Sequence, residues 1–200
     1  MTATQTQVLV GVGASLGGLS ACRRVLAGLS ADLPAAVLIA QHRRPDGLST
    51  LADLLASECA LPVVEPDDKT PIAPGAVYLG PADYHIAVER DGGHIALSTE
   101  PKVNYARPSI DLLFDSIAVS VRARGMAVVL TGASHDGARG ALAVKRAGGR
   151  VLVQDPDEAE SAVCPRAALA LLQPDAVLRL DQIALAVTEW ARLLGRTKSP

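Results

Sequence analysis

The sequence predicts an α/β fold with three layers, in which helices cover both faces of a doubly wound, mostly parallel sheet. Three observations indicate this fold. Apolar runs of strand length alternate with segments of helical periodicity. Short turns separate these segments, many of them rich in Gly, Pro or Asp. Two of the apolar runs flank the Asp-Gly-Gly turn at 91–93, which predicts an antiparallel hairpin at one edge of the sheet.

The first half of the chain contains more strands than helices. Continuous apolar runs predict buried strands at 8–12 and 35–40. A helix is expected at 19–29, and another at 48–57, after the Pro-Asp-Gly turn at 45–47. Short strands are then expected at 62–65, 76–79, 85–88 and 94–97, the last two forming the hairpin.

The second half returns to regular alternation. A helix is expected at 109–122, where Ile110, Leu113, Phe114 and Ile117 share one face. The remaining elements are a strand at 126–130, a helix at 140–147, a strand at 150–154, a helix at 165–172 and a closing helix at about 182–195. Together they predict a single domain over 1–200, with its core at about 8–180.

The composition excludes several classes of function. A net charge of −2 gives no electrostatic basis for binding nucleic acid, and one Trp, three Tyr and one Phe supply few surfaces for base stacking. No apolar run is long enough to span a membrane and no signal peptide is apparent, so we expect a cytoplasmic protein without membrane insertion. Three cysteines form no C-x-x-C pair, and no cluster has metal-ligand spacing. We therefore expect neither a metal nor a cofactor.

The most informative motif is Gly-x-Ser-x-Gly at 13–17, directly after the first predicted strand. Glycines beside a serine permit a strained strand-to-helix turn that exposes the hydroxyl, as in a nucleophile elbow. The N–H groups at the start of the next helix can then stabilise an oxyanion. Ser15 is therefore a candidate nucleophile.

Two partners for Ser15 follow other predicted strands. His42 comes just after the strand at 35–40, and Asp136 lies in the loop after the strand at 126–130. The carboxyl ends of parallel strands meet at one edge of a sheet, so these side chains can converge there. A serine needs a base, and the base needs a carboxylate that fixes its tautomer. The three residues are therefore predicted to form a catalytic triad.

Simpler interpretations exist for each of these residues. Ser15 can shape a phosphate-binding turn, although the third glycine falls at 17, where a dinucleotide-binding fingerprint requires 16. Asp136 can be a helix N-cap. The order Ser, His, Asp also differs from that of the α/β-hydrolases and of two protease families.

Six segments in order resemble the catalytic domain of the chemotaxis protein-glutamate methylesterase family, CheB. They are VGASLGG (12–18), QH (41–42), YH (84–85), RPSIDLLF (107–114), LTGASHDGA (130–138) and PRA (165–167). The resemblance extends from about residue 8 to residue 180.

The resemblance implies hydrolysis of glutamate γ-methyl esters on methyl-accepting chemoreceptor helices, with release of methanol, and deamidation of some receptor glutamines. It assigns Ser15 as nucleophile, His42 as base and Asp136 as the carboxylate that orients the base. It also places the oxyanion-binding N–H groups at Leu16 and Ala133.

The chain departs from the family pattern at several positions. Leu16 stands where a small hydroxyl residue is usual, Ala133 where Met is frequent, and Arg43-Arg44 where Met-Pro is common. The family's N-terminal receiver domain has no counterpart in these 200 residues. We therefore expect no phosphorylation control within this chain, unless a separate receiver or kinase protein provides it or the sequence is a fragment.

Two further residues of the family pattern are candidate substrate contacts. His85 is either structural or faces the substrate, and Arg107 either holds a helix start or contacts receptor carboxylates. The competing functions are a non-enzymatic interaction module on the same fold, and an esterase of the same mechanism with another substrate. A nucleotide-binding protein is a more distant alternative.

Overall fold

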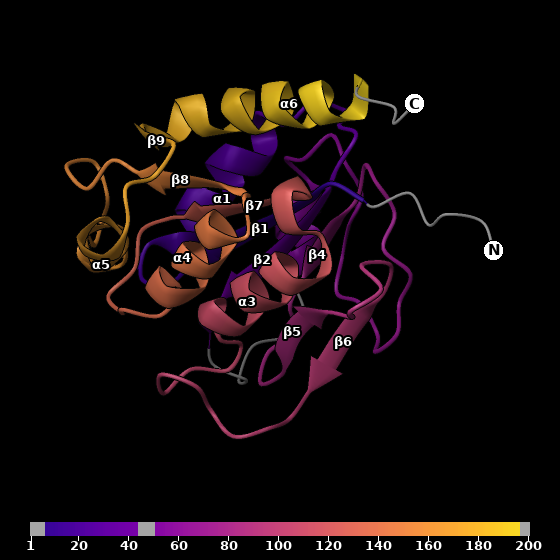
Figure 1. Ribbon diagram of the computed structural model, residues 1–200, viewed down its shortest axis with the longest axis horizontal. Helices are drawn as coiled ribbons and strands as arrows, with labels where there is room; N and C mark the ends of the chain where they lie inside the picture. The colour runs from indigo at the N-terminus through magenta and orange to yellow at the C-terminus, as the bar shows by residue number, and fades with distance from the viewer. Residues whose placement is uncertain (1–6, 44–50, 197–200) are drawn as a thin grey trace.

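A computed structural model describes residues 7–43 and 51–196 of the chain. Its centre is a parallel sheet of seven strands in the order β3-β4-β2-β1-β7-β8-β9 (Figure 1). The strands are β1 (Leu9–Ala14), β2 (Ala36–Gln41), β3 (Val63–Val64), β4 (Val77–Leu79), β7 (Gly125–Val129), β8 (Arg150–Gln154) and β9 (Ala176–Leu178). Every pairing within this sheet is parallel, as the alternating sequence pattern predicts.

Helices cover both faces of the sheet and complete the three predicted layers (Figure 1). The helices are α1 (Gly18–Ala27), α2 (Leu51–Ala56), α3 (Ile110–Ser120), α4 (Ala138–Arg146), α5 (Val163–Leu171) and α6 (Leu180–Arg196), with a short 3₁₀ turn η1 (Arg122–Arg124). One hydrophobic core lies between the sheet and α1, α2 and α6. A second lies between the sheet and α3, α4 and α5.

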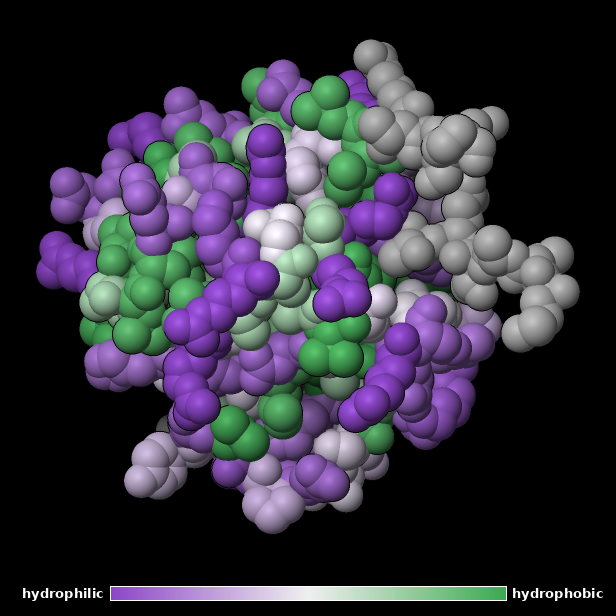
Figure 2. All heavy atoms as spheres, in the orientation of Figure 1, coloured by the Kyte–Doolittle hydropathy of each residue, from purple (hydrophilic) through white to green (hydrophobic). Residues whose placement is uncertain are grey.

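The face of the molecule shown in Figure 2 is largely hydrophilic, with hydrophobic side chains gathered at its left, where α5 lies in Figure 1. Two of the exposed apolar residues of that helix are Val163 and Leu171. The inner side of α5 carries the buried Cys164 and Ala168. The helix therefore closes the second core while its outer side remains exposed.

Strand β1 at the centre of the sheet contacts both cores because its side chains alternate between the two faces. Val8, Val10 and Val12 face the first core. On the other face, a Cβ atom at Gly11 or Gly13 would lie within 3 Å of a side-chain atom of α3. The two glycines therefore let α3 pack closely against β1.

The antiparallel hairpin predicted from the turn at 91–93 is confirmed. Strands β5 (His85–Val88) and β6 (Ile95–Ser98) pair in antiparallel register. Within the described residues, however, they form a separate two-stranded sheet and are not hydrogen-bonded to an edge of the main sheet. The hairpin packs against α3, and its buried Ile86 and Ile95 belong to the second core.

The strand order changes direction at β1. Strand β2 lies on one side of β1, and β7 lies on the other. In open α/β sheets, the crevice outside the carboxyl ends of the strands at such a switch point is the usual place for a ligand. Ser15 follows β1, His42 follows β2, and the loop with Asp136 follows β7, so the topology brings all three to this crevice.

Candidate active site

Ser15 lies on a short turn between β1 and α1, as the Gly-x-Ser-x-Gly pattern predicts. Its N–H donates to the carbonyl of Thr131 (3.0 Å), and its carbonyl accepts from the N–H of Gly18 (2.9 Å) and from Gln41 Nε2 (2.9 Å). Gly17 has a φ of 76°, a left-handed conformation that favours glycine. These contacts fix the backbone on both sides of the serine, which remains half-buried.

The loop after β7 packs directly against this turn. A Cβ atom at Gly132 would lie 2.7 Å from Ser15 Cβ and 2.4 Å from Cys164 Sγ. The hydroxyl of Thr131 donates to the carbonyl of Leu16 (2.9 Å). The absence of a side chain at 132 therefore lets the loop that precedes Asp136 come close to Ser15.

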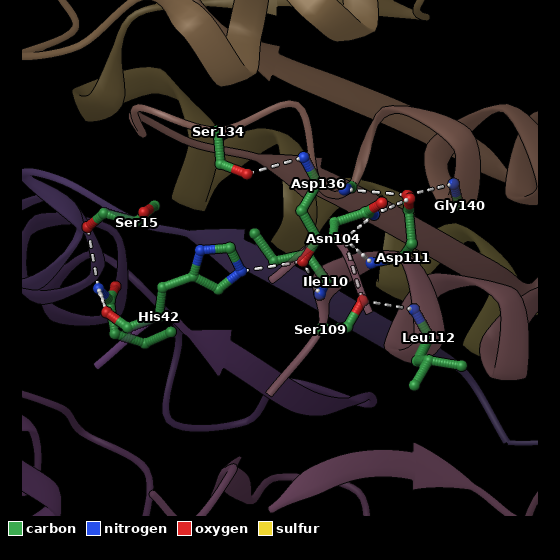
Figure 3. A network of polar contacts seen from close by, with 12 residues as sticks. Ser15, His42, Asn104, Ser109, Ile110, Asp111, Leu112, Ser134, Asp136 and Gly140 are labelled. Atoms are coloured by element: carbon green, nitrogen blue, oxygen red, sulfur yellow. Dashed lines mark hydrogen bonds and ion pairs between the residues drawn. The ribbon is translucent and has the colours of Figure 1, made fainter. Parts of the chain in front are cut away.

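His42 extends from the end of β2 into the site, and its backbone N–H donates to the carbonyl of Ala14 (3.0 Å). Its Nε2 lies 2.9 Å from Asp136 Oδ2. Figure 3 shows the imidazole between Ser15 on one side and the Asp136 carboxylate on the other. A carboxylate only accepts hydrogen bonds, so Nε2 carries a proton, and in the neutral imidazole the lone pair is then on Nδ1.

The Asp136 side chain is completely shielded from solvent. Its Oδ1 accepts from Asn104 Nδ2 (2.9 Å), Ser109 Oγ (2.9 Å) and the N–H of Asp111 (3.1 Å), and its Oδ2 also accepts from the N–H of Ile110 (2.6 Å). Burial alone raises the pKa of this carboxyl, but the hydrogen bonds, led by that from His42, outweigh burial and lower the pKa below its ordinary value. The carboxylate therefore stays ionised beside the histidine.

Asp136 also acts as a cap, although not for the helix that follows it. The N-cap of α4 is Gly137, and the Asp136 carboxylate instead accepts from Ile110 and Asp111, the first two N–H groups of α3. The positive end of the α3 dipole thus adds to its stabilisation. Asp136 therefore does not form the N-cap expected at the start of α4, and the carboxylate that lies on His42 caps α3 instead.

The N–H groups of Leu16 and Ala133 were predicted to bind an oxyanion. Within residues 7–43 and 51–196, neither N–H donates to an acceptor. A cavity of about 560 Å³ adjoins the serine, and Ser15, Leu16 and His42 line it. Ala133 is exposed and lies outside that lining, although its neighbour Gly132 contacts Ser15. The amide of Leu16 is thus the better placed of the two in this structure.

The structure places His85 away from solvent. The residue is 2% exposed, its Nδ1 accepts from the N–H of Ser109 (3.1 Å), and its Nε2 lies 3.2 Å from the carbonyl of Pro101. A ring with both nitrogens in use inside the protein is not available to a substrate. This placement favours the structural interpretation of His85.

Arg107 is also held by the protein itself. Its guanidinium donates to Asp83 Oδ1 (3.0 and 2.8 Å) and to the carbonyls of Thr99 (2.6 Å) and Glu100 (3.0 Å). The side chain lines a second cavity, of about 330 Å³, that also reaches His42. Arg107 therefore shapes the wall of this cavity, and its ion pair with Asp83 weakens its attraction for a further carboxylate.

The sequence predicts two positive charges beside His42, those of Arg43 and Arg44. Arg43 forms an ion pair with Glu65 and donates to the carbonyl of Gly80 (3.2 Å). Arg44 lies outside the described residues. The charge of Arg43 is thus largely balanced within the protein.

Three residues that support the site were not identified as functional from the sequence. Gln41 holds the carbonyl of Ser15, Thr131 holds that of Leu16, and Asn104 contacts Asp136. Gln41 and Thr131 are buried polar residues that directly follow apolar runs, which is a usable signal. Asn104 lies in an irregular segment, and nothing in its local sequence distinguishes it.

The described part of the chain contains neither a helix that could span a membrane nor a group of potential metal ligands. None of its helices is both long and apolar enough to cross a membrane. In 7–43 and 51–196, no three His, Cys, Asp or Glu side chains are grouped so that they could hold a metal ion.

Comparison with known proteins supports the resemblance seen in the sequence. The family model described as CheB methylesterase matches residues 10–187. A protein-glutamate methylesterase/protein-glutamine glutaminase of Hahella chejuensis is 43% identical over 189 residues, which are 92% of this chain and 52% of the relative. One from Caulobacter vibrioides is 43% identical over 186 residues, or 90% of this chain and 53% of that protein. The chain thus spans about half the length of these relatives.

The fold is similar to a solved structure as well. The crystal structure of the Thermotoga maritima CheB methylesterase catalytic domain matches with a TM-score of 0.88 and 30% sequence identity. The match covers 92% of this chain and 98% of that one. The relatives found by sequence and the solved structure therefore both match nearly the whole of this chain.

Proposed function

The chain belongs to the CheB methylesterase family, and we propose that it is a serine hydrolase that cleaves glutamate γ-methyl esters on chemoreceptor helices and releases methanol. One observation carries this proposal. The imidazole of His42 lies between Ser15 and the buried carboxylate of Asp136, with 2.9 Å between Nε2 and Oδ2 (Figure 3). In serine hydrolases a histidine held by a buried carboxylate takes the proton of a neighbouring serine, which supports Ser15 as the nucleophile.

In the acylation step, Ser15 Oγ attacks the ester carbonyl carbon while its proton passes to Nδ1 of His42. Asp136 stabilises the imidazolium that forms, because its carboxylate stays ionised. The tetrahedral intermediate then collapses, the bond from carbon to the methoxy oxygen breaks, and His42 returns the proton to that oxygen. The products are methanol and a γ-glutamyl ester of Ser15.

In the deacylation step, a water molecule gives its proton to His42 and attacks the acyl carbon. The bond to Ser15 Oγ breaks, the serine regains its proton, and a free glutamate carboxyl group leaves. The N–H of Leu16, which lines the cavity beside Ser15, is the donor for the oxyanion in both steps, and the family resemblance assigns that of Ala133 as the second donor. A donor of this kind contributes roughly 10²–10³ in turnover.

The same intermediate accounts for a second activity. The relatives' names include protein-glutamine glutaminase. If Ser15 attacks a glutamine side chain, His42 protonates the departing amine, and ammonia leaves in place of methanol. We therefore extend the proposal to deamidation of receptor glutamines at this site.

The test is methanol release from membranes that contain methylated chemoreceptor, with the wild-type chain and two serine variants. Ser15→Ala should abolish release while leaving thermal unfolding unchanged, because the half-buried hydroxyl makes no structural hydrogen bond within the described residues. Ser120→Ala is the matched control. Ser120 is the last residue of α3, whereas Asp136 contacts the first turn of that helix. Removal of the Ser120 hydroxyl should therefore leave methanol release unchanged.

Release that persists in Ser15→Ala would exclude this mechanism. Receptor binding without release by the wild-type chain would instead indicate an interaction module on the same fold. Cleavage of small esters but not of methylated receptor would indicate an esterase with another substrate.

A further inference from the structure

Asn104 connects the candidate triad to a second buried carboxylate. Its Nδ2 lies 2.9 Å from Asp136 Oδ1 and 2.9 Å from Asp111 Oδ2 (Figure 3). Ionised carboxylates only accept hydrogen bonds, so the NH₂ end of the amide faces both of them. Each of its two hydrogens is thus used by a different aspartate.

Asp111 is itself firmly held. Its Oδ1 accepts from the N–H of Gly137 (2.9 Å) and of Gly140 (2.7 Å), which belong to the N-terminus of α4. Asp111 sits in the first turn of α3, and Asp136 lies just before α4. Each helix therefore receives its N-terminal carboxylate from the other, and Asp111 is a fixed point for Asn104.

The orientation of the Asp136 carboxylate depends on the donors at Oδ1. That oxygen accepts from Asn104, Ser109 and the N–H of Asp111, and these donors fix the carboxylate together with the Ile110 N–H at Oδ2. Ser109 and the Asp111 N–H belong to the buried start of α3. Asn104 is exposed and comes from a different segment, so it is the donor that can be removed without disturbing the helix.

We propose that Asn104 is a positioning residue for the reaction. By bridging Asp111 and Asp136 it holds Oδ2 of Asp136 on Nε2 of His42, and it separates two negative charges that would otherwise repel each other. This inference rests on the proposed triad. Asn104 acts through Asp136, because its side-chain hydrogen bonds in the described structure go to Asp111 and Asp136 and not to Ser15 or His42.

The backbone of Asn104 determines which variants test this. Its φ is 51°, in the left-handed region that Asn and Gly tolerate and Ala does not. Asn104→Gly removes the amide and keeps this conformation accessible. Asn104→Asp keeps the size and replaces the donor by an acceptor, which places a third carboxylate beside Asp111 and Asp136.

For Asn104→Gly, we expect kcat toward 4-nitrophenyl acetate to fall about tenfold, with KM within about twofold of wild type, because misplaced catalytic groups affect the chemical step. The kcat of Asn104→Asp should fall further than that of Asn104→Gly, because repulsion between the carboxylates adds to the loss of the hydrogen bond. The proton on His42 Nε2 should give a low-field ¹H NMR signal. We expect that signal to shift or broaden in both variants, while thermal unfolding changes little.

Lys69→Gly is the matched control. Lys69 also has a positive φ (64°), is exposed, and lines neither of the two cavities that reach His42. It gains the same backbone freedom and should keep both kcat and the His42 signal.

An unchanged kcat in Asn104→Gly, an unchanged His42 signal, or an equal loss in Lys69→Gly would each overturn the proposal. The NMR comparison needs no substrate. It therefore tests whether Asn104 orients Asp136 toward His42 separately from whether hydrolysis uses Ser15.

Discussion

Asp136 shows how single residues combine structural and chemical roles in this site. Its carboxylate is buried, which alone would favour the protonated form. Hydrogen bonds from His42, Asn104 and the first N–H groups of α3 stabilise the ionised form more strongly. The interactions that cap α3 therefore also keep the carboxylate ready to support His42.

This carboxylate should make stability depend on pH in acid. The pKa of Asp136 is lowered in the folded state, and the unfolded value is about 3.9. Its stabilising contribution is therefore complete above the unfolded pKa and is lost as pH falls through the folded pKa. The difference in free energy of unfolding between the wild type and Asp136→Asn should shrink from pH 5 to pH 2, as measured by urea denaturation. A difference that is constant over this range would contradict the lowered pKa.

The cysteine near Ser15 provides a second prediction at this scale. Burial raises the pKa of the Cys164 thiol to about 11 and that of Cys22 to about 12, while Cys59 is only partly buried. Alkylation requires the thiolate. Iodoacetamide at pH 8 should therefore modify Cys59 first, and Cys22 and Cys164 only after unfolding, as peptide mass spectrometry can show. Rapid modification of Cys164 in the folded protein would contradict the burial that raises its pKa.

At the scale of elements, the close contact of α3 with β1 determines where the helix begins. Gly11 and Gly13 leave space for Ile110, Phe114 and Ile117. This contact brings the N-terminus of α3 to the carboxyl end of the sheet, where its N–H groups meet Asp136. The small residues of β1 therefore serve the site as well as the core.

Gly13→Ala should disturb this contact. The added Cβ would lie 2.2 Å from Ile110 Cγ2, so α3 must shift. We expect a loss of about 1–3 kcal/mol in the free energy of unfolding. The kcat of the folded protein should also fall, because the N–H of Ile110 donates to Asp136.

Gly93→Ala is the control for this change. A Cβ at Gly93 would meet only Asp91, at an ordinary 3.7 Å. Stability and kcat should both stay close to wild type. If Gly13→Ala has the same stability and kcat as Gly93→Ala, the close contact between α3 and β1 is needed neither for stability nor for the position of Ile110.

At the scale of the whole molecule, the strand order explains why residues so distant in sequence converge. The switch point at β1 places the carboxyl ends of β2, β1 and β7 side by side. Ser15, His42 and the loop of Asp136 leave the sheet at these ends. The candidate site is therefore built from the segments that follow three different strands of the sheet, β1, β2 and β7.

Much of this arrangement is predictable from sequence because it follows strand ends. The apolar runs locate the long strands, and Ser15, His42 and Asp136 each follow one of them. Strand β9 is missed, because its apolar run Ala176–Leu178 is only three residues long and is partly exposed. Asn104 is missed as well, since its role depends on how an irregular segment lies against α3 and α4, which no local pattern encodes.

The most direct test of the central claim is to identify the nucleophile by covalent labelling with a fluorophosphonate, followed by peptide mass spectrometry. The account predicts one adduct, on Ser15, which forms rapidly in the wild type and is greatly slowed in His42→Ala because the base is missing. A fluorophosphonate adduct on another residue, or labelling of Ser15 that does not depend on His42, would contradict the proposed triad.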